Sequence, residues 1–385
     1  MKRENLIRLK NSYFYGVKKE DIMIDPRPEL SKLSDYVPGK SMEEIRAKYG
    51  LSEVVKLASN ENPLGASPKA VEAFHEIAGA LHLYPRGDAP KLINAIADFY
   101  GVNTNQIVIG NGSDEIIDMV GKAFIRQGDN CVGITPTFSV YKFTTLSNGA
   151  DFIGVGIGDQ KTPLSELLKA INDKTRVVFI CSPNNPTGVY YNKQELLEFL
   201  DKVPSKVLVF LDQAYSEFAT AEDYPVLIDM LDKYKNLFIN RTFSKIYGLA
   251  GLRIGYAMAN AEVIKSMWKI KPPFDVNQAA QVAAIAALSD KEHVKKTLEL
   301  NAAGIKYLTP EFESLGFKVL PTQGNFICVH IGPKAKDLVL FLEQNGMIVR
   351  GLTSFGLPEH IRVTLGKREE NELLVSLVKK WKAQV

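Results

Sequence analysis

The sequence has little cysteine, no excess of one charge and no long apolar run. Its three cysteines are widely separated and flanked by apolar residues, so we expect no disulfides and a reducing compartment. Lysine and arginine number 47 against 44 for aspartate and glutamate, without a run of five like charges, which argues against a nucleic-acid or membrane surface. No stretch approaches the ~18 apolar residues that a membrane span needs. Together these absences predict a cytoplasmic protein.

Motifs for metal and dinucleotide binding are also missing. The five histidines show no metal-ligand spacing, and neither C-x-x-C nor H-E-x-x-H occurs, so we expect no metal. The glycines of 154–158 do not match G-x-G-x-x-G, which argues against a dinucleotide site. Zinc chemistry, dinucleotide chemistry and a serine-type catalytic triad are therefore not expected.

What the sequence does contain is an ordinary globular balance, with 45% apolar and 24% charged residues. Between about residues 71 and 288, short β-branched runs alternate with helix-like stretches, which is typical of βα units in a mostly parallel sheet. Each run is nearly continuously apolar, as expected of a strand that helices cover on both faces. The runs span 106–110, 131–135, 176–181, 206–211 and 237–240.

The length of 385 residues favours one large and one smaller domain. We predict an N-terminal extension over 1–25, a loop-rich segment over 26–70 that joins the small domain, and a large α/β domain over 71–288. A long helical pattern followed by strand-rich sequence predicts a smaller α+β domain over 289–385.

Polar or aromatic groups follow five consecutive apolar runs. These segments are 111–115, 136–141, 182–188, 212–218 and 241–245. Ligands of open α/β sheets bind beyond the carboxyl ends of the strands, so we expect the functional site at this edge of the sheet.

The last of these segments ends at Lys245, which has Thr242, Ser244 and Arg253 nearby in the sequence. A lysine near a strand end is commonly a surface charge. A lysine amine also forms Schiff bases with carbonyls, and nearby cations or desolvation keep it neutral and nucleophilic. Two hydroxyls and an arginine on the same loop suit a phosphate. The loop therefore predicts either a surface charge or a covalent site for a phosphate-bearing carbonyl compound.

The first segment offers a second place for a phosphate. Gly112 and Ser113 stand where a helix should begin, so free backbone N–H groups and the positive end of the helix dipole would face the sheet edge. A plain capped helix, with Ser113 or Asp114 as the cap, explains the same residues. The two interpretations are compatible, because a cap and an anion site use the same donors.

The remaining segments supply groups that could surround a planar ligand. Asp212 directly follows an apolar run and is either a turn former or a carboxylate that pairs with a protonated ring nitrogen. Tyr215 offers a hydroxyl three residues later. Asn185 projects from the proline-bounded turn 183–188, and Phe138 either stacks on the ligand or packs in the core.

These pieces occur in a recognisable order over about residues 30–380. The ordered motifs are SNENPLG, YP, NGSDE, PTF, SPNNPTG, DQAY, TFSK, GLRIGY, NGMIVR and IRVTLG. The sequence thereby resembles the pyridoxal-phosphate aminotransferases of fold type I, most closely the histidinol-phosphate aminotransferase branch. The resemblance implies the fold of that family, a large domain with a mostly parallel, helix-covered sheet and a smaller α+β domain.

The resemblance also implies roles for individual residues. Lys245 would hold pyridoxal phosphate covalently and move the proton, Asp212 would pair with the ring nitrogen, and Tyr84 would reach the partner's cofactor phosphate across a homodimer. The implied cofactor contacts are Tyr84, Gly112, Ser113, Asp114, Phe138, Asn185, Asp212, Tyr215, Thr242, Ser244, Lys245 and Arg253. The implied substrate contacts are Tyr36, Asn185, Arg350 and Arg362.

By the same resemblance, the expected reaction is amino transfer between L-histidinol phosphate and 2-oxoglutarate in histidine biosynthesis. The sequence departs from the family in reading D-Q-A-Y for D-E-A-Y at 212–215 and in having Phe138 for tyrosine. The loop 351–360 resembles that of aromatic aminotransferases of this branch. An aromatic aminotransferase, a phosphothreonine decarboxylase and an inactive regulator on this fold are therefore the alternatives.

Overall fold

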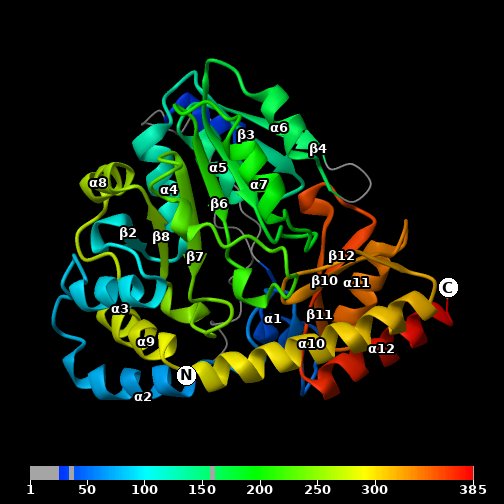
Figure 1. Ribbon diagram of the computed structural model, residues 1–385. Coiled ribbons are helices and arrows are strands. Elements are labelled where there is room, and N and C mark those ends of the chain that lie inside the picture. Colours follow the sequence, from blue (N-terminus) through cyan, green and yellow to red (C-terminus); the bar gives the residue numbers. More distant parts are fainter. Residues whose placement is uncertain (1–25, 34–38, 157–160, 385) are drawn as a thin grey trace.

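The computed structural model describes residues 26–33, 39–156 and 161–384 (Figure 1). The predicted extension over 1–25 and the predicted substrate contact Tyr36 lie outside the described residues. Two β-sheets organise the described part of the chain, one of seven strands and one of five. This arrangement confirms the expected α/β fold with a large sheet and a smaller one. The exact division at residues 70 and 288 stays a prediction.

The large sheet has the strand order β2-β8-β7-β6-β5-β3-β4. Strands β3 to β7 run parallel, whereas β8 is antiparallel to both of its neighbours. The strands are β2 (Ile107–Gly110), β3 (Asn130–Thr135), β4 (Asp151–Gly156), β5 (Thr175–Cys181), β6 (Leu208–Asp212), β7 (Leu237–Thr242) and β8 (Gly255–Ala259). The five predicted runs thus form strands, and β4 and β8 are additional.

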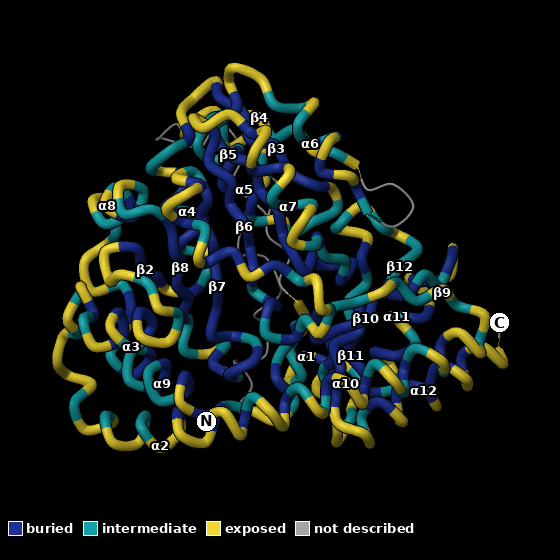
Figure 2. Tube along the Cα trace, viewed as in Figure 1, coloured by how far each residue is buried: buried dark blue, intermediate teal, exposed yellow. Residues whose placement is uncertain are grey.

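Both faces of the large sheet are buried beneath helices, as Figure 2 shows. Val178 and Ile180 of β5 point into one apolar cluster, while Val177 and Phe179 point into the other, as the alternation of side chains along a strand requires. One face is covered by α4 (Ser113–Phe124), α5 (Val140–Ser147) and α8 (Ala261–Ile270). The other is covered by α3 (Pro90–Tyr100), α6 (Leu164–Ala170), α7 (Lys193–Leu200) and α9 (Gln278–Leu288), with α2 (Pro68–Ile77) against α9.

The small sheet has the order β1-β11-β12-β10-β9. Its strands are β1 (Val55–Leu57), β9 (Lys318–Val319), β10 (Phe326–His330), β11 (Met347–Gly351) and β12 (His360–Thr364). The helices α10 (Lys291–Ser314), α11 (Ala335–Gln344) and α12 (Arg368–Lys382) pack around it in a separate apolar cluster. Figure 1 shows α10 running along the base of the molecule from beside α9 to the small sheet. Of the helices that the structure describes, none has the length and apolar character to cross a membrane.

One helix lies in the segment that the sequence predicted to be loop-rich. Met42–Tyr49 forms α1, which begins with a capping box between Ser41 and Glu44 and ends at Gly50 with φ +67°. Within this helix only Ile45 is buried, so the apolar periodicity that reveals longer helices is absent. The 3-10 turns are Pro28–Lys32, Ala78–Ala80, Thr104–Gln106, Ser216–Phe218, Ile228–Met230, Ala250–Leu252 and Thr353–Phe355.

Gln213 stands where the family resemblance leads one to expect glutamate, and its side chain contacts Arg241 of β7. The side chain of Arg241 is buried and forms an ion pair with Glu217, with 3.2 Å between Nη1 and Oε1. Its Nη2 donates to the Oε1 atom of Gln213 at 2.9 Å. Gln213 is therefore a neutral partner of Arg241, and Glu217 supplies the negative charge. A buried guanidinium needs such a charge, because desolvation is otherwise uncompensated.

We predict that Glu217→Gln destabilises the protein by about 3 kcal/mol, because it leaves the buried Arg241 without a carboxylate. The double variant Gln213→Glu/Glu217→Gln should recover part of this loss, since a carboxylate then stands beside Nη2. Thermal unfolding midpoints of the two variants and of Gln213→Glu alone provide the measurement. Equal midpoints for Glu217→Gln and the unaltered protein would contradict the assignment.

Candidate active site

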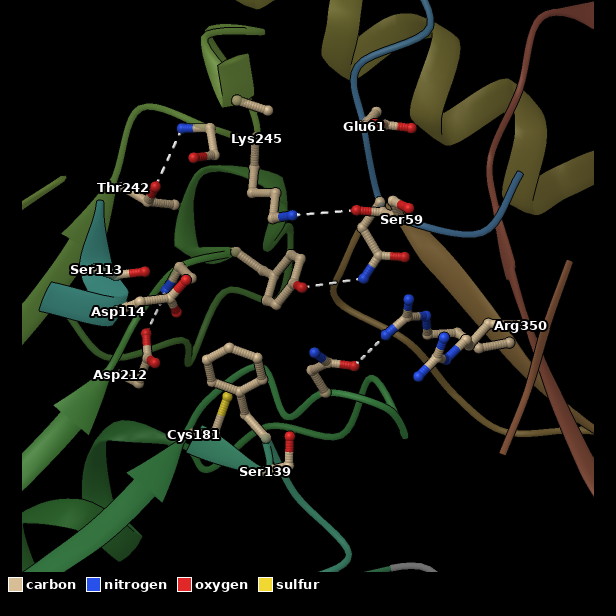
Figure 3. A pocket seen from close by; sticks show the side chains of 18 of the residues that line it. Ser59, Glu61, Ser113, Asp114, Ser139, Cys181, Asp212, Thr242, Lys245 and Arg350 are labelled. Atoms are coloured by element: carbon tan, nitrogen blue, oxygen red, sulfur yellow. Dashed lines mark hydrogen bonds between the residues drawn. The ribbon is translucent and has the colours of Figure 1, made fainter. Parts of the chain in front are cut away.

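A cavity of about 340 Å³ lies between the carboxyl edge of the large sheet and the small sheet. Its wall includes most of the residues that the sequence singled out. These are Ser113, Asp114, Phe138, Asn185, Asp212, Tyr215, Thr242, Ser244, Lys245, Arg253, Arg350 and Arg362. Figure 3 shows Ser113, Asp114 and Asp212 on one side of the pocket and Arg350 on the other, with Lys245 between them. Chain segments more than 250 residues apart thus meet in one site.

Lys245 follows β7 on a loop that a local hydrogen bond shapes, the Ser244 N–H donating to the Thr242 Oγ1 atom at 3.1 Å. The Lys245 ammonium donates to the carbonyl of Ser59 at 3.2 Å. Burial, and then the nearby guanidinium of Arg362, lower the pKa of Lys245 to about 8. A substantial fraction of this amine is therefore neutral near physiological pH, which is the form that attacks a carbonyl.

Asp212 ends β6 and is 3% exposed. Its Oδ2 accepts a hydrogen bond from the Tyr141 hydroxyl at 2.6 Å, and its Oδ1 accepts from Asn240 Nδ2 at 3.2 Å and from the Ala214 N–H at 3.1 Å. Burial nevertheless raises the pKa of Asp212 to about 6, although these hydrogen bonds oppose the change. The carboxyl group therefore favours a cationic ligand.

Tyr215 and Asn185 also line the cavity, and both are hydrogen-bonded to residues in or beside the small sheet. The Tyr215 hydroxyl accepts a hydrogen bond from Asn60 Nδ2 at 2.9 Å, and burial raises the pKa of Tyr215 to about 12. The Oδ1 atom of Asn185 accepts from Arg362 Nη1. Tyr215 is therefore a neutral hydroxyl, and Asn185 links the loop after β5 to β12.

Arg253 lines one end of the cavity, and Gly112 lies directly behind its guanidinium. Gly112 is the N-cap of α4 and has φ +83°, so the alternative with Ser113 or Asp114 as the cap is wrong. A Cβ atom at Gly112 would lie 2.4 Å from Arg253 Nη2, so a larger residue there would displace the guanidinium, and the positive φ also favours glycine. Since no cap side chain occupies the first N–H groups of α4, these donors and the guanidinium can bind a phosphate.

Arg350 and Arg362 make the opposite end of the cavity cationic. They are register partners on β11 and β12. Arg362 donates through Nη2 to the Ala58 carbonyl at 2.6 Å, and its Nε is buried without a partner in the described part of the chain. Arg350 lies over the Phe355 ring at 5.9 Å. Among the described residues no aspartate or glutamate pairs with either guanidinium, so the pair is open to an anionic ligand.

Tyr84 lies apart from these residues and does not line the cavity. Its side chain is 83% exposed, and its ring packs against that of Phe274 with 5.0 Å between the centroids. Gly112 is not part of the cavity wall. It affects the cavity through its neighbours, the guanidinium of Arg253 and the start of α4.

Sequence reasoning missed three polar side chains that support the site. Tyr141 and Asn240 hold Asp212, and Asn60 holds Tyr215. Each belongs to a segment that the sequence had marked, respectively 136–141, the run 237–240 and the SNENPLG motif. A pattern marks a segment, but the direction of each side chain depends on the packing of the helix or loop that carries it.

The comparison with protein families decides the classification, since the family model described as aminotransferase class I and II matches residues 52–378. The chain belongs to this family. The aminotransferase is 42% identical over 349 residues to a histidinol-phosphate aminotransferase of Geobacillus sp. (strain WCH70), covering 91% of this chain and 96% of that one. It is 45% identical over 350 residues to one of Moorella thermoacetica, covering 91% of each chain.

A solved structure is similar over nearly the whole aminotransferase. The histidinol-phosphate aminotransferase of Sinorhizobium meliloti, in complex with pyridoxal-5'-phosphate, superposes with a TM-score of 0.87 at 25% identity. The match covers 95% of this chain and 99% of that chain. The expected family and fold are thereby confirmed.

We predict that Lys245 in the cofactor-free aminotransferase reacts with an aldehyde at a rate that rises with pH and levels off above about 8, because only the neutral amine reacts. An ordinary lysine would show this midpoint near ~10.4. Borohydride trapping followed by mass spectrometry of the Lys245 peptide gives the profile. In Arg362→Met the midpoint should move upward, since a neighbouring cation is lost. A midpoint near that of free lysine would contradict the burial of the amine.

Proposed function

We propose that this aminotransferase transfers the amino group of L-histidinol phosphate to 2-oxoglutarate, giving imidazole-acetol phosphate and glutamate in histidine biosynthesis. The observation that carries the proposal is the pair Arg350 and Arg362, which faces the cavity without a carboxylate partner in the described residues. Relatives named histidinol-phosphate aminotransferase at 42% and 45% identity support the same reaction.

The donors in the cavity fit pyridoxal phosphate as the cofactor. The start of α4, Arg253 and the hydroxyls of Ser113 and Ser244 suit its phosphate, and the absence of a side chain at Gly112 leaves room for the Arg253 guanidinium. Asp212 suits its protonated ring nitrogen, because a cation there would stabilise a carboxylate that burial disfavours. When bound, the cofactor supplies an electron sink for the substrate carbon that carries the amino group.

The nitrogen of Lys245 has two tasks in this scheme. As a neutral amine it would hold the cofactor covalently, and the same Nζ would take a proton from the substrate carbon and later return one. Its lowered pKa suits both tasks, since the optimum for proton transfer lies near the working pH. Tyr215 and Asn185 would orient the ring through hydrogen bonds at its hydroxyl, and Phe138 would lie against its face.

The two arginines would hold the substrate anion. Guanidinium groups form forked hydrogen bonds with phosphate and carboxylate alike, so one pair can serve histidinol phosphate in one half-reaction and glutamate in the other. Asn185 fixes Arg362 in place. The predicted contribution of Tyr36 concerns a residue outside the described part of the chain.

The proposal includes a cytosolic homodimer in which Tyr84 reaches the cofactor phosphate of the partner subunit. The Tyr84 ring is exposed and does not line the cavity of its own chain, which supports this role. Three buried, unpaired cysteines, Cys131, Cys181 and Cys328, are compatible with a reducing compartment.

One observation favours a second candidate, an aromatic amino-acid aminotransferase. Phe355, on the loop 351–360, lines the cavity beside Arg350 and could contact an aromatic substrate ring. The two candidates differ in the ligand of the arginines, which is a phosphate in one and an α-carboxylate in the other.

We predict that the loaded enzyme turns over histidinol phosphate faster than phenylalanine, tyrosine or phosphothreonine. Arg350→Gln should lower kcat/KM for histidinol phosphate about 10- to 100-fold, because charge-assisted hydrogen bonds to the phosphate are lost. Arg46→Gln on the exposed face of α1 is the control and should change nothing. Single-turnover spectra with each amino donor provide the measurement. Faster reaction with phenylalanine would select the aromatic candidate, and carbon dioxide release from phosphothreonine would select a decarboxylase.

We also predict that Gly112→Ala weakens the binding of pyridoxal phosphate by about tenfold or more, because the new methyl group displaces the Arg253 guanidinium. Gly128→Ala is a matched control, since Gly128 has φ +82° but a Cβ added there would meet no atom within 4 Å. Absorbance titration of the cofactor-free proteins measures both affinities. Equal effects of the two substitutions would assign the loss to backbone strain and contradict the phosphate site.

A further inference from the structure

The loop between α8 and α9, residues 271–276 with the sequence KPPFDV, contains an aromatic residue in an unfavourable backbone conformation. Phe274 has φ +60°, a left-handed value that bulky side chains rarely adopt. Its side chain is 48% exposed, so burial in the core does not compensate for this conformation. The contacts of the surrounding loop must therefore hold it.

The Phe274 ring is directed at Tyr84. The two centroids are 5.0 Å apart and the ring planes are inclined by 33°. The turn that carries Tyr84 packs against loop 271–276. A Cβ atom added at Gly87 of this turn would lie only 3.4 Å from the backbone nitrogen of Phe274. The first turn of α9 fixes it further, since Gln281 Nε2 donates to the Arg86 carbonyl at 3.3 Å. Tyr84 is therefore exposed on one side and supported by Phe274 on the other.

The loop is also anchored to the phosphate end of its own site. Lys271 and Asp275 form an ion pair whose side chains are only 3% and 4% exposed. Burial, and then the neighbouring Asp275, raise the pKa of Glu115. The Oε2 atom of Glu115 accepts a hydrogen bond at 2.6 Å from the N–H of Asn111, in the turn that leads into α4.

A second anchor joins the end of the loop to Leu252, the residue before Arg253. Asn277, the N-cap of α9, donates through Nδ2 to the carbonyl of Leu252 at 3.1 Å. One short loop thus contacts the start of α4, the residue before Arg253 and the Tyr84 turn.

We propose that Phe274 is a positioning residue, which holds the Tyr84 ring in the orientation that reaches the cofactor phosphate of the partner subunit. This inference rests on the proposed homodimer. Phe274 acts within its own chain on Tyr84, and its effect is therefore felt in the other chain's site. The same loop is also linked to the turn 111–113, through Glu115, and to Leu252. It therefore supports both the proposed phosphate site of its own chain and the tyrosine that would reach the site of the partner subunit.

The first test is the affinity of cofactor-free protein for pyridoxal phosphate. Phe274→Ala should weaken it about tenfold, because the ring that supports Tyr84 is removed, while Phe274→Tyr should retain it. Phe143→Ala, which removes a ring that is 51% exposed on α5, is the control and should leave the affinity unchanged. Unchanged affinity in Phe274→Ala would overturn the inference.

Mixed dimers locate the defect. In the first mixed dimer, one chain carries Phe274→Ala and the other carries Lys245→Ala. The one remaining Lys245 then receives Tyr84 from the chain in which Phe274 is intact. Borohydride trapping on this Lys245 should therefore show normal affinity for pyridoxal phosphate. When one chain carries both substitutions and the other neither, the affinity should fall about tenfold. A defect that follows the chain with Lys245 would overturn the inference.

Sedimentation of the unaltered protein tests the homodimer separately from the role of Phe274. A monomer that binds the cofactor tightly would contradict the homodimer and the role of Phe274 together. A dimer with normal affinity in Phe274→Ala would contradict the role of Phe274 alone.

Discussion

The parallel register of β5, β6 and β7 is the constraint on which the site depends. It sets Cys181, Asp212 and Asn240 side by side at the ends of three neighbouring strands. Asp212 is consequently buried between protein groups and not among water molecules, and Tyr141 and Asn240 fix both of its oxygens. The loops after the same strands carry the lysine and the hydroxyl groups of the site, so the sheet edge determines their spacing.

Burial changes the pKa values of the two central groups of the cavity in opposite directions. It lowers the pKa of Lys245 and raises that of Asp212, because in both cases the charged form loses its hydration. The amine becomes a better nucleophile, and the carboxyl group becomes dependent on a positive partner. A ligand with a carbonyl near the lysine and a basic nitrogen near the aspartate satisfies both requirements, which is why the geometry and the family membership agree.

The sequence allowed prediction of the site residues that directly follow the ends of strands. Lys245 and Asp212 come just after apolar runs, Arg362 was expected only from the family resemblance, and all three line the cavity. The supporting residues escaped prediction, because Tyr141 reaches Asp212 only through the packing of α5 against the sheet. The strands β4 and β8 escaped as well, since glycine and alanine weaken their strand signal. Helix α1 was not predicted because only Ile45 within it is buried, so it has no apolar periodicity. The role of Tyr36 stays a prediction.

The placement of positive charge at both ends of the cavity has a mechanical consequence. Arg253 belongs to the large sheet's side and Arg350 with Arg362 to the small sheet's side, so like charges face one another across a gap that protein anions only partly neutralise. In the proposed function, a cofactor phosphate near Arg253 and a substrate anion near Arg350 and Arg362 would together bridge the two sides of the cavity. Binding of both ligands would then stabilise the folded chain, because they bind only where the two sheets are correctly placed.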